Sequence, residues 1–130
     1  YLEDRVREAG KKKYVTTIMQ RRRYVPEITS DNIRIRNFAE RTAINAPIQG
    51  SAADIIKMAM IKIHKKLHEM KSRMILQVHD ELVFEVRPDE LEKVTSLVKD
   101  EMEQVVKLKV PVSVNLKTGK NWLDMKGYTK

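Results

Sequence analysis

The sequence of 130 residues contains no cysteine, which excludes a disulfide framework and any metal site built from thiolates. It also lacks an apolar run of about 18 residues, the length that a membrane-spanning helix needs. The first five residues have neither an initiator Met nor the apolar core of a signal peptide. We therefore expect a piece of a longer chain that has no membrane partner.

Internal repeats, low-complexity stretches and linkers are missing too, and an apolar fraction of 42% is enough for one folded domain. The net charge of +8 is unevenly distributed along the chain. Residues 1–45 hold 11 Lys and Arg against 6 Asp and Glu, whereas residues 80–110 hold 5 against 9. A basic first part predicts a polyanionic partner, with nucleic acid ahead of an anionic membrane surface.

Apolar residues alternate along both arms of the stretch 74–86, and this period of two predicts a β-hairpin. A three-residue loop, 79–81, would put both apolar sets on one face. A two-residue loop would put them on opposite faces, because a slip of one residue reverses every side chain. The alternating residues are Met74, Leu76 and Val78 on the first arm and Leu82, Phe84 and Val86 on the second.

The hairpin tip, which we define as His79, Asp80 and Glu81, carries an imidazole and two adjacent carboxylates, which a turn does not need for stability. Carboxylate oxygens are the ligands that hard divalent cations prefer, so the tip is a candidate metal site. Short acidic turns are also common as plain solvated loops. The residues of the tip alone leave both interpretations open. Gln77, one alternation before the tip, is expected to support it rather than to react.

The first half of the chain predicts a short helix at 2–12, followed by a hairpin or extended ribbon over 14–25. Ser, Asp and Asn at 30–32 are good N-caps for a helix that runs to about residue 45. Pro47 is then expected to break or kink the path.

The second half predicts helices at 52–70 and 89–106, each with a regular apolar stripe. A strand follows at 112–116, and Trp122 is expected to pack under the sheet edge. The fold class is therefore α+β. A small antiparallel sheet, made of the 74–86 hairpin and the 112–116 strand, packs against the two helices.

Polar residues recur every fourth position between residues 37 and 49, which places them along one side of a helix. We call this set the polar ridge. Solvated helix faces usually carry Lys and Glu, whereas the ridge combines amides with one Arg. Such donors match the minor-groove acceptors that every base pair presents, and they check duplex shape with little dependence on sequence. A plain solvated face is the alternative. The ridge consists of Asn37, Arg41, Asn45 and Gln49.

Several stretches, in order and spacing, resemble the motifs of family A DNA polymerases, the DNA polymerase I family. Gln77 to Leu82 is similar to the motif C of that family. The resemblance covers essentially the whole chain, so it is much more specific than any one motif. The other matching stretches are Arg-Arg-Arg-Tyr-Val-Pro at 21–26, Phe-Ala-Glu-Arg-Thr-Ala at 38–43, Asn-Ala-Pro-Ile-Gln-Gly-Ser-Ala-Ala-Asp at 45–54 and Gly-Lys-Asn-Trp at 119–122.

The resemblance implies that residues 1–130 are the C-terminal part of a polymerase palm, with the base of the fingers at 1–30. It implies template-directed nucleotidyl transfer to a primer 3′-hydroxyl, as in DNA replication and repair. The cofactor would be Mg²⁺, as two ions that clamp the attacking and leaving oxygens. The partners would be primer–template DNA and deoxynucleoside triphosphates, in a bacterial-type cytoplasmic, nucleoid-associated enzyme.

Roles for individual residues also follow from the resemblance. Asp80 would be a metal ligand and a catalytic residue, and Glu81 would assist catalysis directly or through water. His79 would touch the backbone of the primer terminus. The remaining expected DNA contacts are Arg23, Arg41, Asn45 and Gln49.

The chain departs from the family in one important respect. Family members need a second metal-binding aspartate upstream and a fingers helix that holds the nucleotide phosphates. Neither is found here, since Asp4 and Asp31 lie in the wrong contexts. We therefore expect half of an active site and an isolated chain that is inactive. One alternative is a non-catalytic basic nucleic-acid-binding module. A further alternative is a carboxylate-dependent nuclease, which would need more acidic residues near the hairpin than the sequence places there.

Overall fold

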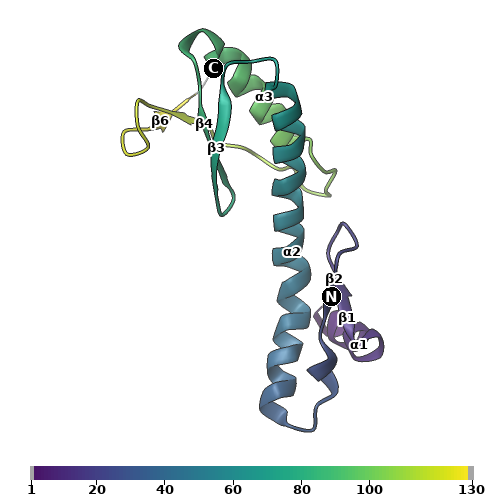
Figure 1. Cartoon of the computed structure of the whole chain (residues 1–130). Helices are drawn as coiled ribbons and strands as arrows, with labels where there is room; N and C mark the ends of the chain where they lie inside the picture. Colours follow the sequence, from purple (N-terminus) through teal and green to yellow (C-terminus); the bar gives the residue numbers. More distant parts are fainter. Residues whose placement is uncertain (1, 129–130) are drawn as a thin grey trace. The chain divides into compact units, whose positions relative to one another are not determined.

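The computed structural model describes residues 2–128 and combines helices with three two-stranded antiparallel sheets (Figure 1). The chain divides into two compact units, residues 1–54 and residues 55–130. The mixed fold class with small antiparallel sheets is as predicted. None of the helices in the described part of the chain combines the length and apolar character needed to cross a membrane.

The first unit begins with helix α1 (Leu2–Lys12), which has acidic residues in its first turn and lysines in its last. This charge order suits the helix dipole. Lys13 ends the helix with a left-handed backbone, at φ 62°. Strand β1 (Tyr14–Thr16) then pairs antiparallel with β2 (Arg22–Tyr24), so the predicted ribbon is a hairpin.

A small apolar core holds the first unit together. A 3₁₀ turn (Pro26–Thr29) follows β2 and leads into the long helix α2 (Ile33–Leu67). The small side chains that α2 places in this core allow the hairpin and α1 to approach its backbone closely. The buried residues are Ala9, Val15, Val25, Ile28, Ala39 and Ala43.

Helix α2 begins at the predicted cap, because the Asn32 side chain accepts hydrogen bonds from the backbone N–H groups of Arg34 and Ile35. The expectation that Pro47 would break the helical path is wrong, since Pro47 lies inside α2. Proline has no backbone N–H, so the helix lacks one hydrogen bond at this position. The helix on either side of it is fixed by burial of its own apolar face in a core.

The second unit packs the last part of α2 against helix α3 (Leu91–Glu103), which a 3₁₀ turn (Pro88–Glu90) precedes. Strands β3 (Arg73–Val78) and β4 (Glu81–Glu85) form the predicted hairpin, and one of its faces covers this core. Both predicted helical stripes are therefore confirmed. The buried residues are Ala59, Ile63, Leu67, Val94, Val98 and Val105.

The C-terminal strand was wrongly predicted. Residues 112–116 form no strand, and a separate sheet pairs β5 (Lys117–Thr118) with β6 (Lys126–Gly127). The backbone N–H of Val114 donates to the Glu103 side chain at 2.9 Å instead of to a strand. Trp122 was expected under a sheet edge, but it lies in the β5–β6 connection and is 50% exposed.

Replacing Ile63 with Ala should destabilise the chain by about 2–5 kcal/mol, because the buried side chain leaves a cavity behind. Ile63 is fully buried, whereas Ile61 on the same helix is 56% exposed. Ile61→Ala is therefore the matched control and should stay within about 0.5 kcal/mol of wild type. Urea unfolding followed by circular dichroism measures both, and equal losses would contradict this description of the core.

Candidate functional site

The hairpin tip is shaped by an unusual pairing of β3 with β4. Val78 pairs with Glu81, so only His79 and Asp80 lie in the loop. The predicted three-residue loop is therefore wrong, and Glu81 is the first residue of β4. The register shifts by one residue between Met74 and Leu76, which makes a β-bulge.

The bulge decides which side chains face the core. Paired residues share a face, so Met74 lies with Phe84, and Gln77 lies with Leu82. Met74, Leu82 and Phe84 pack against the core of the second unit. Leu76 pairs with Val83 and Val78 pairs with Glu81, so both lie on the opposite face of the hairpin. The six apolar residues therefore do not share one face, as they would with a three-residue loop. Glu81 also lies on the face turned away from Leu82.

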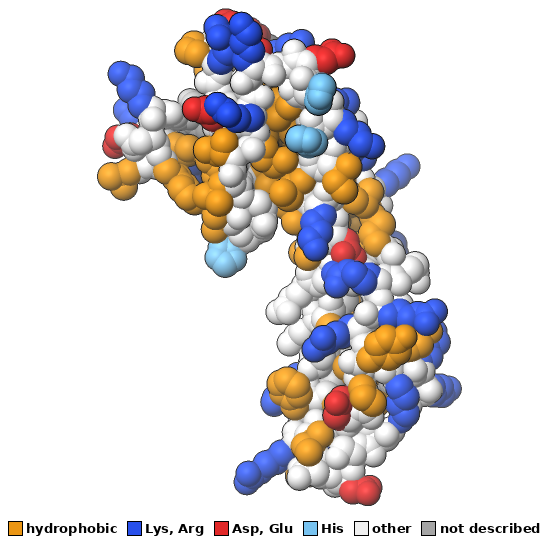
Figure 2. Space-filling view, in the orientation of Figure 1, with side chains coloured by type: hydrophobic (Ala, Val, Ile, Leu, Met, Phe, Trp, Pro, Cys, Tyr) orange, Lys and Arg blue, Asp and Glu red, His pale blue; other side chains and the backbone are white. Residues whose placement is uncertain are grey.

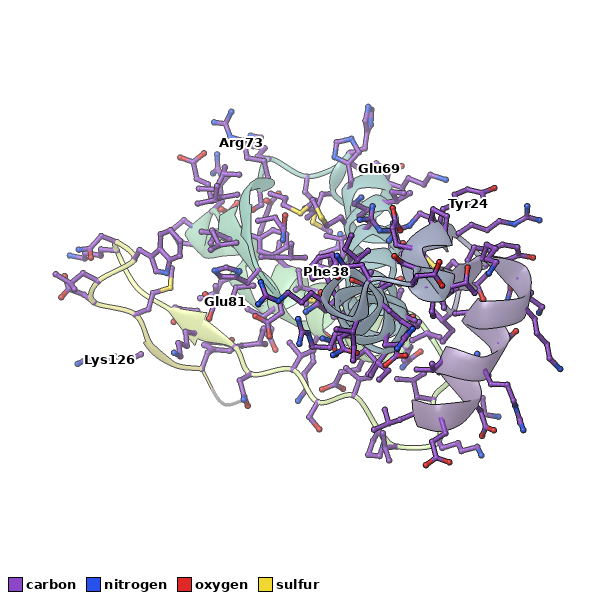
Figure 3. The ribbon with its side chains drawn as sticks, turned by 90° about the horizontal axis from the view of Figure 1, so that it is seen from below. Tyr24, Phe38, Glu69, Arg73, Glu81 and Lys126 are labelled. Atoms are coloured by element: carbon purple, nitrogen blue, oxygen red, sulfur yellow. The ribbon has the colours of Figure 1, made fainter. Side chains whose placement is uncertain are left out.

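The backbone at the tip is held in a tight conformation. His79 has φ 53°, in the left-handed region that side chains rarely adopt. The Gln77 side-chain amide donates to the His79 carbonyl at 2.5 Å, as expected of a residue that supports the tip. Figure 3 shows Glu81 and Arg73, which the register places at opposite ends of the hairpin.

Asp80 and Glu81 are both exposed, and no hydrogen bond or salt bridge in the described part of the chain engages either carboxylate. Their oxygens fit a hard cation such as Mg²⁺. Across residues 2–128, however, no group of three His, Asp or Glu side chains is placed to hold a metal ion. The described part of the chain therefore offers a cation at the tip ligands from one side only.

A set of hydrogen bonds that we call the base clamp fixes the other end of the hairpin. The Glu90 carboxylate accepts from the backbone N–H groups of Lys71 and Ser72, at 3.1 and 2.8 Å. It also accepts from the Ser72 hydroxyl, which in turn accepts from the Arg87 N–H at 3.1 Å. Ser72 precedes β3, Arg87 follows β4 and Glu90 precedes α3, so the clamp orients the hairpin on α3.

These donors lower the pKa of Glu90, first through the Ser72 hydroxyl and then through the Lys71 N–H. Sequence reasoning did not single out Glu90 or Ser72. They lie 18 positions apart, and a helix start rich in acids explained Glu90 without a partner.

In the first unit, all four residues of the polar ridge are exposed on α2. The core residues Ala39 and Ala43 point the other way from the same helix. The ridge is therefore free to meet a partner, although nothing in the geometry assigns it a ligand. Figure 2 shows many Lys and Arg side chains and few acidic ones around this unit.

Two consecutive arginines of β2 lie on opposite faces of the β1–β2 hairpin. The Arg22 guanidinium stacks over the Tyr14 ring at 4.8 Å, and the Tyr24 ring meets Tyr14 edge-on. Arg23 pairs with Val15, so it lies on the face that Val15 buries in the core. Arg23 itself is exposed, which leaves its guanidinium available at the rim of that face.

The predicted site residues thus fall into two groups, each within its own unit. Arg23 and the polar ridge belong to the first unit, and His79, Asp80 and Glu81 meet at the tip in the second. Sequence reasoning also missed Arg21 and Asp54, which form a salt bridge at 2.9 Å across 33 positions of chain.

A family model described as DNA polymerase family A matches residues 1–124. Over 128 residues the chain is 56% identical to the DNA polymerase I of Bacillus subtilis (strain 168) and 52% identical to that of Geobacillus stearothermophilus. These matches cover 97% of this chain but only 14% and 15% of the two relatives.

A solved structure with a TM-score of 0.83 and 50% identity is described as the POL domain of Pol1 from M. smegmatis in complex with DNA primer-template and dNTP. The similarity covers 85% of this chain and 20% of that one. The chain therefore spans a small part of the length of the proteins that it matches.

The base clamp predicts a pH dependence of stability. Because the folded-state pKa of Glu90 lies below its usual 4.5, the clamp should stabilise the fold above that pH. This contribution should be lost as the pH falls through the lower folded-state value. Urea unfolding from pH 7 to pH 3 should show a gap between wild type and Glu90→Gln that closes in acid. Glu69→Gln, an exposed carboxylate before β3, is the control, and a gap of the same form there would contradict the assignment.

Proposed function

The chain belongs to DNA polymerase family A, and on that premise we propose that it forms part of a DNA-directed DNA polymerase. Residues 1–130 would be the C-terminal part of the palm, with the base of the fingers at 1–30. The observation that carries the proposal is the exposed Asp80–Glu81 pair, presented at a hairpin tip and engaged by no other described side chain.

The proposed reaction is nucleotidyl transfer to a primer. The primer 3′-hydroxyl would lose its proton to solvent as its oxygen bonds to the α-phosphorus of a deoxynucleoside triphosphate. The bond from that phosphorus to the oxygen that bridges to the β-phosphate would break, and pyrophosphate would leave. Bound Mg²⁺ ions would supply electrostatic stabilisation of the attacking and leaving oxygens. Asp80 would hold one metal through its carboxylate, and Glu81 would assist directly or through water. His79 would contact the backbone of the primer terminus from the same tip.

The first unit would hold the duplex. Arg41, Asn45 and Gln49 can donate hydrogen bonds to minor-groove acceptors that all base pairs share, so the contacts would follow duplex shape and not sequence. Arg23 would bind a backbone phosphate, since an exposed guanidinium is well suited to phosphate oxygens. The excess of basic over acidic residues in 1–45 supports this assignment.

One hairpin tip is not a complete site. Two catalytic metals lie about 3.5–4 Å apart and must be held from more than one side. Asp80 and Glu81 are sequence neighbours, and no third acidic or His ligand joins them in the described residues. We therefore propose that a second carboxylate group from the rest of the polymerase completes the site.

A basic nucleic-acid-binding module without catalysis is the second candidate, and the net charge of +8 favours it. Both candidates predict duplex binding that weakens with salt. They differ in whether the hairpin tip is needed for anything beyond binding, so a substitution at Asp80 separates them.

The test uses a chimaeric family A polymerase in which these 130 residues replace the corresponding segment. Asp80→Asn should reduce primer extension by at least about 10²-fold, because the neutral amide loses the charge that binds the metal. Duplex affinity should change little, since the proposed DNA contacts of the first unit are untouched.

Glu69→Gln, which removes one exposed carboxylate away from the tip, is the charge-matched control and should extend primers normally. If Asp80→Asn extends primers near the wild-type rate, Asp80 is not a metal ligand and the binding-module candidate gains.

A further inference from the structure

A buried acidic residue in the first unit carries an inference beyond the proposed site. The Asp54 side chain is only 10% exposed. Its Oδ1 accepts a hydrogen bond from the Nε of Arg21 at 2.9 Å and forms a salt bridge with a terminal nitrogen of the same guanidinium, also at 2.9 Å. The same terminal nitrogen of Arg21 reaches the Gly50 carbonyl at 3.1 Å. Arg21 is thus fixed to two successive turns of α2.

The loop that carries Arg21 is seated directly on α2. A Cβ at Gly50 would lie 2.6 Å from the Thr17 side chain, so only glycine allows this approach. The Ile18 N–H donates to the Ser51 hydroxyl at 2.9 Å. Thr17 itself is buried and exchanges hydrogen bonds with the backbone of Arg21. The end of the β1–β2 hairpin is therefore locked to the helix.

Fixing Arg21 also constrains the direction of Arg23. Arg21 immediately precedes β2 and is hydrogen-bonded to Thr17, which immediately follows β1, so it closes the hairpin two residues before Arg23. The contacts of Arg21 with Asp54 and Gly50 hold this end of the hairpin against α2. Val15, which pairs with Arg23 and shares its face, is buried in the core. Arg22 lies on the other side, over the Tyr14 ring.

We propose that Asp54 is a positioning residue for DNA binding, which acts through Arg21 to hold Arg23 where a backbone phosphate can reach it. This inference rests on the proposed function. The sign of the effect is distinctive, because an anion near a DNA-binding surface opposes polyanion binding by charge alone. Neutralising Asp54 should nevertheless weaken binding, since the loss of geometry at Arg23 outweighs the gain in net charge.

The experiment titrates a labelled primer–template duplex against the chimaeric polymerase by fluorescence anisotropy at several salt concentrations. Asp54→Asn should raise the Kd several-fold and reduce the salt slope by about 0.9, the value for one lost phosphate contact. Asp31→Asn makes the same charge change at an exposed position and should leave the Kd unchanged or lower.

A second pair of variants tests the route through Arg23. In an Arg23→Ala background, Asp54→Asn should add no further loss, because the phosphate contact is already gone. Equal losses in both backgrounds would show a general structural defect and overturn the proposal. So would an Asp54→Asn Kd equal to or lower than that of wild type.

Two further arms keep the test decisive. If Asp54→Asn fails to fold, Arg21→Lys decides instead, because it keeps the charge but not the guanidinium's paired donors. It should weaken binding only when Arg23 is present. If Arg23→Ala and Arg41→Ala both bind like wild type, the proposed function fails. If those two weaken binding and Asp54→Asn does not, only this inference fails.

Discussion

The pairing register of β3 with β4 is the constraint on which the hairpin and its tip depend. Side chains alternate with a period of two, so one extra residue on one strand reverses every position beyond it. The bulge at Ile75 supplies that residue. It keeps Met74 on the core face with Phe84 although the loop holds only two residues. Glu81 lies on the face away from Leu82 because consecutive residues of β4 alternate. One short hairpin can thus pack its apolar face on the core and expose the carboxylates at its tip.

Both ends of this hairpin are fixed by polar contacts whose geometry is specific. The base clamp joins the residues before β3, after β4 and before α3 through one carboxylate and one hydroxyl. At the tip, Gln77 holds the His79 carbonyl. The carboxylates of Asp80 and Glu81, at the same tip, are left exposed. A rigid support under free charged groups is what a preorganised metal ligand requires.

In the first unit, helix α2 combines two roles on different sides. Small side chains such as Ala39 and Ala43 let the hairpin pack against it, and the polar ridge remains exposed. The salt bridge of Arg21 with Asp54 and the close approach at Gly50 fix the hairpin on that helix. These contacts give the basic β1–β2 hairpin a defined position on α2, which charge alone would not provide.

Much of this architecture could be predicted from the sequence, because local periodicity governs it. The helices, both hairpins and the residues at the tip follow from patterns within a few positions. What could not be predicted depends on tertiary contacts. The bulge at Ile75 has no sequence signature. The continuity of α2 through Pro47 could not be predicted either, because proline usually ends or kinks a helix and only packing on both sides keeps this one whole. The prediction of a strand at 112–116 was wrong because an alternating pattern does not by itself supply a partner strand.

Roles in chemistry and binding are predicted on the strength of the family, and the central claim among them is that this chain supplies half of a two-metal site. The most direct test is a primer-extension assay of the isolated 130 residues with Mg²⁺ and all four deoxynucleoside triphosphates, beside the chimaeric polymerase. The account predicts extension by the chimaera and none by the isolated chain, whose folding circular dichroism would verify. Extension by the isolated chain that is lost on Asp80→Ala would contradict it, because one hairpin tip would then suffice.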